Sequence, residues 1–533
     1  MLLPAMILLT PFLIFVNHFS YDWSDSGTLS SLAIVIGVSL LCSSVMYVDG
    51  RIWHGFIVGG LLTFFIDIQF EPFRGFGLLA KYVWLGTAIG VFTISWMLKE
   101  NFFRIVTVIF AVFFVVTLGQ SFLSTSANDL HFEKPPPRTV DQSLPRIIHL
   151  VLDGHIGIEG IPQDTALGQQ MKVDLKSFYQ KNGFTVFGGA YSHYPLTVSS
   201  ISHLLNFSAS PDEATPQGDP FFEGREPYRL LQNRYFELLS SRGYKLNVLA
   251  DSIHFDYCSG SVVMIDNCVK SALSGMKLLK GSKLVLVDKL RVVFSHFLKS
   301  SYTITVIRHS YNHFRGILSE QGIELPLWNW VVKRPLMPLL SLQFFDTLSE
   351  KIETLPDGNF VYSHLMIPHQ PFVLRSDCSL NPLLDEWEGG GEHNQEQQNT
   401  SFSREKRYRQ YFYQMKCVYR KLDNLFEQMR KHGIFDDSII ILHGDHGSRI
   451  SRFEMYAKYL EHISTRDLED YFSTLFAVKL PNVKEHYSTK RQPIEELLAQ
   501  TLFPNLEITK KTKESEPFFY LRGEEGRKPI NFF

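Results

Sequence analysis

The chain has 533 residues, a formal net charge of −2 and an isoelectric point near 6.8. This length exceeds what one hydrophobic core usually organises, so we expect two domains. The near-neutral charge gives no electrostatic basis for binding nucleic acid and excludes it as the main partner. Composition changes along the chain, which is mostly apolar and aromatic up to about Leu123 and has the charge density of a soluble protein from Ser124 onward.

The N-terminal part contains five apolar runs, most of them close to the roughly 20 residues that a membrane-spanning helix needs. We therefore predict an all-α membrane domain of about five transmembrane helices over residues 1–123. The first run lacks a basic start and a small-residue cleavage site, which favours a retained span over a signal peptide. The runs are Leu2–Val16, Leu29–Val48, Ile52–Phe70, Phe76–Leu98 and Ile105–Phe122.

The distribution of basic residues between these runs predicts the orientation. Arg51, Lys99 and Arg104 favour cytoplasmic connections, and the bias, although weak, has the sign expected for an exported C-terminal domain. We predict a multi-pass inner or plasma membrane protein whose C-terminal domain is periplasmic or extracellular. Residues 124–144, which include Pro135–Pro137, read as a linker to a second domain over residues 145–533.

Four of the five cysteines lie in the polar part of the chain. Pairing of Cys258 with Cys268 and of Cys378 with Cys417 would suit an oxidising compartment. Four free thiols in a reducing compartment are the alternative, and we favour the disulfides.

Two apolar runs, almost three hundred residues apart, end in a similar way. Pro145–Gly154 predicts a buried parallel strand that delivers Asp153 at its C-terminal end, and Ser438–Gly447 predicts another that is followed by Asp445 and His446. Ligands of parallel α/β sheets bind at the carboxyl ends of the strands, so we expect these side chains to converge. Two carboxylates and one imidazole suit Zn²⁺ or Mn²⁺, with Mg²⁺ possible. Either segment alone could be a simple turn, whereas their combination favours a metal site.

A third segment, Ala190–Leu205, changes to helical apolar spacing after Pro195 and places Thr197 at a helix start. Backbone N–H groups and the helix dipole would favour a phosphate there. A nearby metal ion would lower the pKa of the hydroxyl and make it a nucleophile. The alternative is that Thr197 only caps the helix.

These segments, together with His364–Phe372, resemble the sulfatase-like hydrolase/transferase family of the alkaline phosphatase superfamily. They occur in that family's order between Pro145 and about Pro481. The apolar N-terminus followed by an external domain is also similar to bacterial phosphoethanolamine transferases and lipoteichoic acid synthase. The resemblance implies an α/β catalytic domain with a mainly parallel sheet. It also implies a metal site of Asp153, Thr197, Asp445 and His446, with Thr197 becoming phosphorylated.

By the same resemblance, His364 and His369 contact the substrate phosphate or protonate the leaving oxygen. A second metal ion is an alternative for these histidines. Arg449 is a further candidate for binding a phosphate oxygen, and a surface arginine is the alternative. None of the cysteines has the Cys-x-Pro-x-Arg context of true sulfatases, so sulfate-ester hydrolysis is disfavoured. Related transferases often have Glu where this chain has Asp153, which leaves the subfamily open.

The function that these observations favour is a membrane-anchored phosphotransferase. It would take a phosphoethanolamine or phosphoglycerol group from a phospholipid donor and pass it, through a phospho-threonine intermediate, to an envelope lipid or glycan acceptor. A hydrolase that passes the same intermediate to water is the first alternative. A non-catalytic sensor on the same fold is the second, and the complete set of reactive residues argues against it.

One further segment, Lys270–Arg315, mixes basic and apolar residues. It reads either as a basic amphipathic helix on an anionic membrane surface or as a solvated helix packed on the sheet.

Overall fold

The computed structural model divides into two compact units, which are described separately. Unit 1 comprises Met1–Asp129 and Ala272–Pro335, and unit 2 comprises Leu130–Ser271 and Leu336–Phe533. The structure describes residues 3–19, 21–48, 51–70, 79–123, 143–208, 221–223, 228–250, 255–258, 265–270, 279, 282–298, 301–321, 323, 325, 336–387, 399–506, 518–522 and 529–531. Most of the expected linker, residues 124–142, lies outside these ranges.

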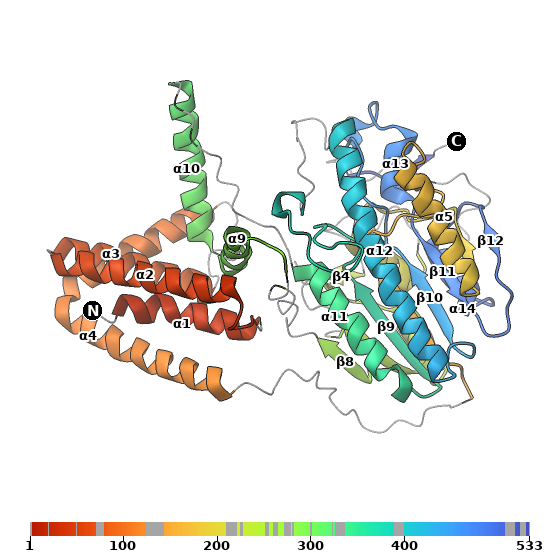
Figure 1. The fold of residues 1–533 in the computed structure, drawn as a ribbon, viewed down its shortest axis with the longest axis horizontal. Helices are drawn as coiled ribbons and strands as arrows, with labels where there is room; N and C mark the ends of the chain where they lie inside the picture. Colours follow the sequence, from red (N-terminus) through yellow and green to blue (C-terminus); the bar gives the residue numbers. More distant parts are fainter. Residues whose placement is uncertain are drawn as a thin grey trace. The chain divides into compact units, whose positions relative to one another are not determined.

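Unit 1 begins with apolar helices that pack on one another (Figure 1). The expected fourth and fifth spans lie in one helix, α4, so this part of the chain does not show five separate helices. The segment Ser26–Met46 is long and apolar enough to cross a bilayer, whereas Leu3–His18, Phe56–Phe70 and Phe103–Gly119 are apolar but shorter. The helices are α1 (Leu3–His18), α2 (Ser26–Val48), α3 (Arg51–Phe70) and α4 (Ala80–Leu123).

Two helices from the middle of the chain, α9 (Leu286–Phe297) and α10 (Tyr302–Glu320), complete unit 1. The Lys289 ammonium lies 2.5 Å from the Asp25 carboxylate, and both side chains are buried. The Asp67 carboxylate accepts hydrogen bonds from the backbone N–H groups of Tyr302 and Thr303 at the start of α10. The carboxylates of Asp25, just before α2, and Asp67, in α3, therefore hold α9 and α10 in place within unit 1.

This packing changes the expected domain boundaries. The second domain does not run uninterrupted over residues 145–533, because residues 272–335 cluster with the N-terminal helices. The buried Lys289 of the basic segment has its partner in Asp25, just before α2, and the start of α10 has its partner in Asp67 of α3. Hydropathy could not reveal this, because a single buried ion pair leaves no periodic pattern in the sequence.

Unit 2 is built on an eight-stranded sheet with strand order β12-β2-β11-β10-β1-β9-β6-β8. Only β11 runs antiparallel to its neighbours, so the sheet is mainly parallel, as expected. All residues of β1 and β9 are buried, which explains their nearly continuous apolar sequences. The strands are β1 (Ile147–Leu152), β2 (Thr185–Phe187), β6 (Lys245–Ala250), β8 (Asn267–Lys270), β9 (Asn359–Leu365), β10 (Ile439–His443), β11 (Phe476–Lys479) and β12 (Tyr487–Ser488).

Helices cover both faces of the sheet, as the α/β architecture requires. One face carries α6 (Thr197–Asn206), α7 (Arg234–Ser241) and α14 (Ile494–Leu502), which form the main hydrophobic core with the central strands. Figure 1 shows α5 (Ala166–Lys181), α11 (Leu336–Lys351) and α12 (Ser401–Lys431) across the other face. The Tyr179 and Tyr419 hydroxyls, 2.7 Å apart, join α5 to α12.

Short elements surround this sandwich. Three small sheets comprise β3 (Ala190–Tyr191) with β13 (Gln492–Pro493), β4 (Phe222–Glu223) with β5 (Tyr228–Leu230) and β7 (Phe255–Asp256), and β14 (Phe518–Tyr520) with β15 (Pro529–Asn531). The remaining helix is α13 (Thr465–Phe472), and the 3-10 turns are η3 (Ile352–Thr354), η4 (Leu384–Glu386) and η5 (Ala457–Tyr459).

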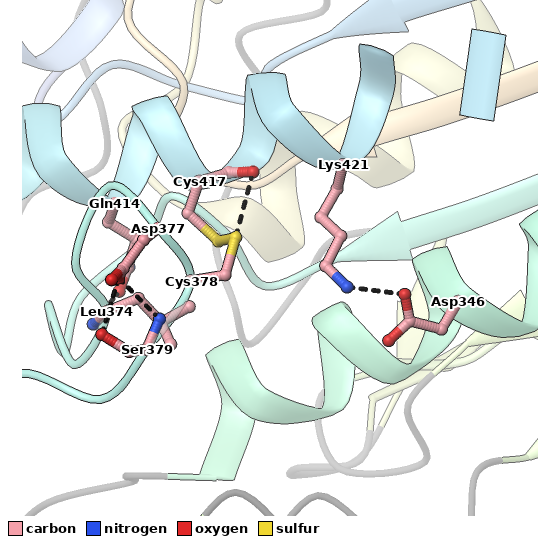
Figure 2. The surroundings of a disulfide bond; sticks show 8 residues. All are labelled: Asp346, Leu374, Asp377, Cys378, Ser379, Gln414, Cys417 and Lys421. Carbon is pink, nitrogen blue, oxygen red and sulfur yellow. Dashed lines mark hydrogen bonds and ion pairs between the residues drawn. A yellow bond between two sulfur atoms is a disulfide. The ribbon is translucent and has the colours of Figure 1, made fainter. Parts of the chain in front are cut away.

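Two disulfides occur in unit 2, and both join the cysteines that we paired from the sequence. Cys258 bonds Cys268, and Cys378 bonds Cys417. Figure 2 shows Cys378, in the loop after β9, bonded to Cys417 on α12. In the same view the Lys421 ammonium of α12 lies 2.6 Å from the Asp346 carboxylate of α11. The second disulfide therefore ties the loop that contains His369 to the long helix.

The buried pair in unit 1 yields a first prediction. Lys289→Met would leave the Asp25 carboxylate buried without its cation, at a cost of about 3 kcal/mol. Local opening of α9 should then increase its amide hydrogen exchange on the order of a hundredfold, measured by mass spectrometry of the full chain in detergent.

The double variant Asp25→Asn/Lys289→Met should recover most of the protection, because it buries no unpaired charge. Lys283→Met, at an exposed position shortly before α9, is the matched control and should leave exchange unchanged. Equal exchange in Lys289→Met and wild-type protein would show that the ion pair does not hold the insertion.

Candidate active site

The two carboxylates expected to converge do so at the carboxyl edge of the sheet. Strands β1 and β10 are parallel neighbours, and Val151 lies opposite His443 in their register. Asp153 and Asp445 therefore leave their strands at the same level, and both side chains are fully buried. The Gly154 N–H donates to Asp445 Oδ1 over 2.9 Å, which fixes one carboxylate beside the other. Gly154 has a φ of 69°, a left-handed conformation that favours glycine.

Three imidazoles surround the Asp153 carboxylate. His364, at the end of β9 on the other side of β1, has Nε2 3.3 Å from Asp153 Oδ2. His446 Nε2 lies 3.5 Å from Asp153 Oδ1 and 3.2 Å from Asp445 Oδ2. His369 Nε2 is more distant, 3.9 Å from Asp153 Oδ1, and its side chain is the most accessible of the three, with 13% exposed.

The other ring nitrogen of each histidine is held by a fixed partner. His446 Nδ1 lies 2.7 Å from the Gly447 carbonyl oxygen, and His369 Nδ1 lies 2.6 Å from that of Gln370. His364 Nδ1 lies 2.7 Å from the Tyr257 hydroxyl. A carbonyl oxygen can only accept, so Nδ1 carries the proton in His446 and His369 and Nε2 presents its lone pair to the carboxylates. Metal-ligating histidines in proteins are oriented in this way.

Burial and charge separate the pKa values of these groups. Burial lowers the pKa of His446 and His369, and the Arg449 guanidinium acts in the same direction. Burial and the neighbouring Asp153 raise the pKa of Asp445. Burial alone would also raise the pKa of Asp153, but His369, His364 and His446 outweigh it, and the pKa is lowered. The lowered pKa values favour the neutral forms of His369 and His446 near pH 7, and a neutral imidazole can bind a metal ion without losing a proton.

The arrangement fits a divalent metal ion. Two overlapping groups have ligand atoms within 4.8 Å of one another, Asp153 with His369 and His446, and Asp153 with His364 and Asp445. Within the described residues, the buried atoms Asp153 Oδ1 and Asp445 Oδ2 accept no hydrogen bond. Mixed oxygen and nitrogen donors of this kind suit Zn²⁺ or Mn²⁺. The histidines that the sequence suggested for substrate contact are thus also placed as possible ligands.

The Thr197 hydroxyl lies beside these candidate ligands, although Thr197 comes from a different segment of the chain. It is the first residue of α6, and its Oγ1 lies 3.1 Å from His446 Nε2 and 3.5 Å from Asp153 Oδ2. The N-cap residue is Leu196, which has no side-chain capping hydrogen bond. The capping role that we considered for Thr197 is therefore not realised, and its hydroxyl faces the candidate metal ligands instead.

The start of α6 is held from both sides. The Ser200 hydroxyl donates to the Asp445 carbonyl oxygen over 2.5 Å. Tyr194 stacks between His203 and Tyr520, with ring centroids 4.3 and 4.9 Å away. Just before it, the buried His193 lies 3.0 Å from the Glu495 carboxylate of α14. These contacts set the position of the Thr197 hydroxyl.

Arg449 is the last of the predicted site residues. It has a φ of 56°, and its Nε and Nη2 atoms are buried without a hydrogen-bond partner among the described residues. Burial lowers the pKa of Arg449, and the Asp445 and Asp153 carboxylates act against that lowering. A guanidinium with free donors beside the ligand set is suited to bind an oxyanion.

Sequence reasoning missed several contributors to this site. Tyr257, which holds His364, lies 107 residues away from it along the chain, and no motif marks it. Ser200 was part of the helical segment without an assigned role. The Gly154 N–H belongs to the backbone, so only the strand register could reveal its contact with Asp445.

A prediction concerns metal binding. Asp445→Asn removes a charged ligand, and we expect metal affinity to fall at least tenfold. The measurement is metal content of purified protein by elemental analysis after dialysis against a graded chelator. Asp437→Asn, an exposed aspartate just before β10, is the control and should retain wild-type metal content. Equal metal retention by the two variants would rule out Asp445 as a ligand.

A second prediction concerns pH. Burial tends to lower the pKa of His193, but the Glu495 carboxylate outweighs it, so the folded-state pKa is raised. Because the pKa of His193 is higher in the folded than in the unfolded protein, protonation of His193 stabilises the folded state. This stabilisation is complete below the unfolded-state pKa of about 6.5 and is lost as pH rises through the folded-state pKa. The unfolding free energy of wild-type protein should therefore fall over that range more steeply than that of His193→Gln. Identical slopes in denaturant titrations would contradict this role.

The chain is similar in part to one family model and, distantly, to several solved structures. A family model described as Protein of unknown function (DUF229) matches residues 383–463. No curated protein matches the sequence. Among solved structures, a protein in the alkaline phosphatase superfamily from Vibrio parahaemolyticus is 11% identical, with a TM-score of 0.35, over 70% of this chain and 68% of that one.

Two further structures are similarly distant. The lipoteichoic acid synthase LtaP from Listeria monocytogenes is 12% identical, with a TM-score of 0.34, over 67% of this chain and 72% of that one. The C-terminal periplasmic domain of EcEptC from Escherichia coli, in complex with Zn, is 10% identical, with a TM-score of 0.35, over 75% and 95%. At these identities and scores the likeness carries no argument about the reaction.

The family expectation thus rests on residues and geometry. A mainly parallel sheet brings together the terminal Asp153, the Asp445-His446 pair and a threonine at a helix start, in the order read from the sequence. The chain resembles the sulfatase-like proteins of the alkaline phosphatase superfamily.

Proposed function

We propose that this protein transfers a phospho-head group, phosphoethanolamine or phosphoglycerol, from a phospholipid to an envelope lipid or glycan by way of a covalent intermediate on Thr197. The observation that carries the proposal is the position of the Thr197 hydroxyl. It lies at an uncapped helix start, is almost completely buried, and is 3.1 Å from a candidate metal ligand, His446. A threonine with only a structural role would not need a set of buried carboxylates and imidazoles around its hydroxyl.

In the first half of the reaction, the Thr197 oxygen attacks the phosphorus of the donor. A new oxygen–phosphorus bond forms, and the bond between phosphorus and the glycerol oxygen of diacylglycerol breaks. A divalent ion held by Asp153, Asp445 and His446 would lower the pKa of the hydroxyl and offset the negative charge of the phosphoryl oxygens. The proton lost by Thr197 equals the proton gained by diacylglycerol, so one proton carrier suffices.

His369 is the residue that we propose as this carrier. Burial lowers its pKa, with Arg449 acting in the same direction, so its ring is neutral before the reaction and can accept a proton. Its side chain is more exposed than those of His364 and His446, which places it toward the incoming substrate. A proton taken up at Nε2 can then pass to the departing glycerol oxygen.

Two features of the site would bind the phosphoryl group itself. The first N–H groups of α6 have no side-chain cap, and the positive end of the helix dipole favours an anion there. The Arg449 guanidinium has two buried donor atoms without partners in the described structure. An arginine can form two parallel hydrogen bonds to a phosphate.

The apolar N-terminus supports a lipid donor. The segment Ser26–Met46 has the length and hydropathy of a membrane span, and the neighbouring helices are also apolar. An anchored enzyme keeps its site near the depth of phospholipid head groups, which raises the effective concentration of a lipid substrate. We extend the proposal to a catalytic unit on the periplasmic or extracellular side, which the two disulfides also favour.

In the second half, an acceptor hydroxyl or phosphate oxygen takes the group from Thr197, and the reaction is ping-pong. A hydrolase would use the same intermediate and differ only in passing the group to water. The residues around Thr197 serve both outcomes, so the acceptor step must be resolved by experiment.

The test is the intact mass of the full chain after incubation with divalent metal and mixed phospholipids. Wild-type protein should gain a mass equal to one phosphoethanolamine or phosphoglycerol group, located on Thr197 by peptide mapping. Thr197→Ala should gain none, because it has no nucleophile.

Thr197→Ser is the matched control, because it keeps the hydroxyl and should keep the adduct. Absence of an adduct on wild-type protein, with no release of diacylglycerol, would overturn the transferase proposal. Loss of the adduct on a chase with water alone would favour the hydrolase.

A further inference from the structure

One side of α12 carries side chains that are bonded to the loops and turns of the candidate site. Arg407, Tyr411, Gln414 and Cys417 recur every three or four residues, which places them on the same side of the helix, and all four are buried. Burial of a polar side chain is unfavourable unless its hydrogen bonds are satisfied. The partners of these side chains therefore indicate what this side of α12 does.

Gln414 is bonded to the loop that contains His369. Its Nε2 donates to the carbonyl oxygens of His369 and Pro368 over 2.8 and 3.2 Å, and to that of Pro371 over 3.4 Å. Its Oε1 accepts a hydrogen bond from the Leu374 N–H over 3.2 Å (Figure 2). Carbonyl oxygens only accept and the backbone N–H only donates, so the amide can take only this orientation.

The sequence of this loop explains why it needs a donor from outside. Pro368 and Pro371 have no N–H group, so the segment around His369 has fewer donors of its own. The Arg407 guanidinium, two turns earlier on α12, donates to Gln370 Oε1 over 2.5 Å. His369 is thus held through contacts of the residues on both sides of it, not through its ring alone.

Tyr411 is bonded to the turn after β1, which carries Asp153. Its hydroxyl donates to the Gly154 carbonyl oxygen over 2.9 Å and accepts a hydrogen bond from the Ile156 N–H over 2.9 Å. Burial raises the pKa of Tyr411, so the hydroxyl keeps the proton that it donates. Gly154 in turn donates its own N–H to Asp445. Tyr411 therefore fixes the turn that brings the two carboxylates together.

The loop and the turn held by α12 also contact each other. A Cβ atom on Gly154 would lie 3.4 Å from His369 Cα, so the two backbones pack closely. Tyr411 and Gln414 are three residues apart, which is about 4.5 Å along the helix axis. One rigid helix thus sets where the His369 loop lies relative to the Asp153 turn, and with it the 3.9 Å between His369 Nε2 and Asp153 Oδ1.

We propose that Gln414 and Tyr411 are positioning residues that together hold the His369 ring in place beside the candidate metal ligands. The role of His369 as proton carrier rests on the proposed function, whereas its placement rests on the contacts of α12. Placement matters for the rate, because a misplacement of about 1 Å can lower it on the order of a hundredfold.

The first measurement follows the His369 ring independently of the reaction. Diethyl pyrocarbonate modifies accessible neutral imidazoles, and mass spectrometry of peptides gives the rate at His369 in the metal-loaded full chain in detergent. Gln414→Met and Tyr411→Phe should each raise this rate about tenfold, because the loop or the turn opens more often once its hydrogen bonds are lost. The exposed His486 is the internal standard and should react at the wild-type rate in every variant.

Gln410→Met and Tyr179→Phe are the matched controls. Gln410 is buried on the same helix, and its amide is bonded to Glu386 and Asn381. Tyr179 is a buried tyrosine whose hydroxyl lies 2.7 Å from that of Tyr419. Each control loses a buried polar group of the same kind as its test variant. The controls should therefore lower the unfolding midpoint without faster modification of His369.

The second measurement tests whether this placement serves the reaction. The rate of adduct formation on Thr197 is compared in a double-mutant cycle of Gln414→Met and His369→Ala. Gln414→Met should lower the rate about tenfold on its own and less than about twofold in the His369→Ala background, because it acts through His369. A role in stability alone would lower the rate by the same factor in both backgrounds.

The outcomes separate the placement of His369 from the reaction. If test variants and controls give equal rates of His369 modification, or if Gln414→Met lowers the adduct rate equally in both backgrounds, the positioning role is wrong. If wild-type protein forms no adduct but only the test variants accelerate the modification, the proposed function is wrong and the positioning role stands. Should Gln414→Met unfold, Tyr411→Phe, which removes one oxygen atom, replaces it in both measurements.

Discussion

Unit 2 depends on two buried carboxylates that the sheet forces together. Asp153 and Asp445 leave adjacent parallel strands at the same edge, and neither side chain reaches solvent. Two like charges in a buried site are unfavourable without positive charge, and burial together with Asp153 already raises the pKa of Asp445. Burial lowers the pKa of the His369 and His446 imidazoles, so these two rings are suited to provide ligands and not the missing charge. A divalent cation would supply the positive charge that the two carboxylates need and would use the imidazoles as ligands. The remaining site residues would then surround this cation.

Each of the three histidines is oriented by a group that is not itself a candidate metal ligand. The Gly447 and Gln370 carbonyls fix two of the imidazoles, and Tyr257 fixes the third. The loop that carries His369 is tied to α12 by the Cys378–Cys417 disulfide (Figure 2). This rigidity matters for catalysis because a nucleophile and its proton carrier contribute only when they are held in a reactive geometry. The start of α6 has no side-chain cap, so its N–H groups are available to an anion.

Unit 1 solves a related problem of buried charge in a different way. Its apolar helices and the residues that link them contain Asp25 and Asp67, which would be costly to bury alone. An insertion from the middle of the chain supplies a lysine for the first and backbone N–H groups for the second. In both units a buried carboxylate thus recruits its partner from a distant part of the sequence.

The sequence by itself determined the fold class, the two disulfide pairs that the structure contains and the strand-end positions of Asp153, Asp445 and His446, because strand burial and turn residues leave local patterns. Tertiary structure decided the rest. It joined residues 272–335 to the apolar helices, merged two expected spans into α4, and brought Tyr257 to the site. The physical reason is that these contacts are single hydrogen bonds, ion pairs and ring contacts between distant segments. Such contacts have no periodicity, so only the folded chain reveals them.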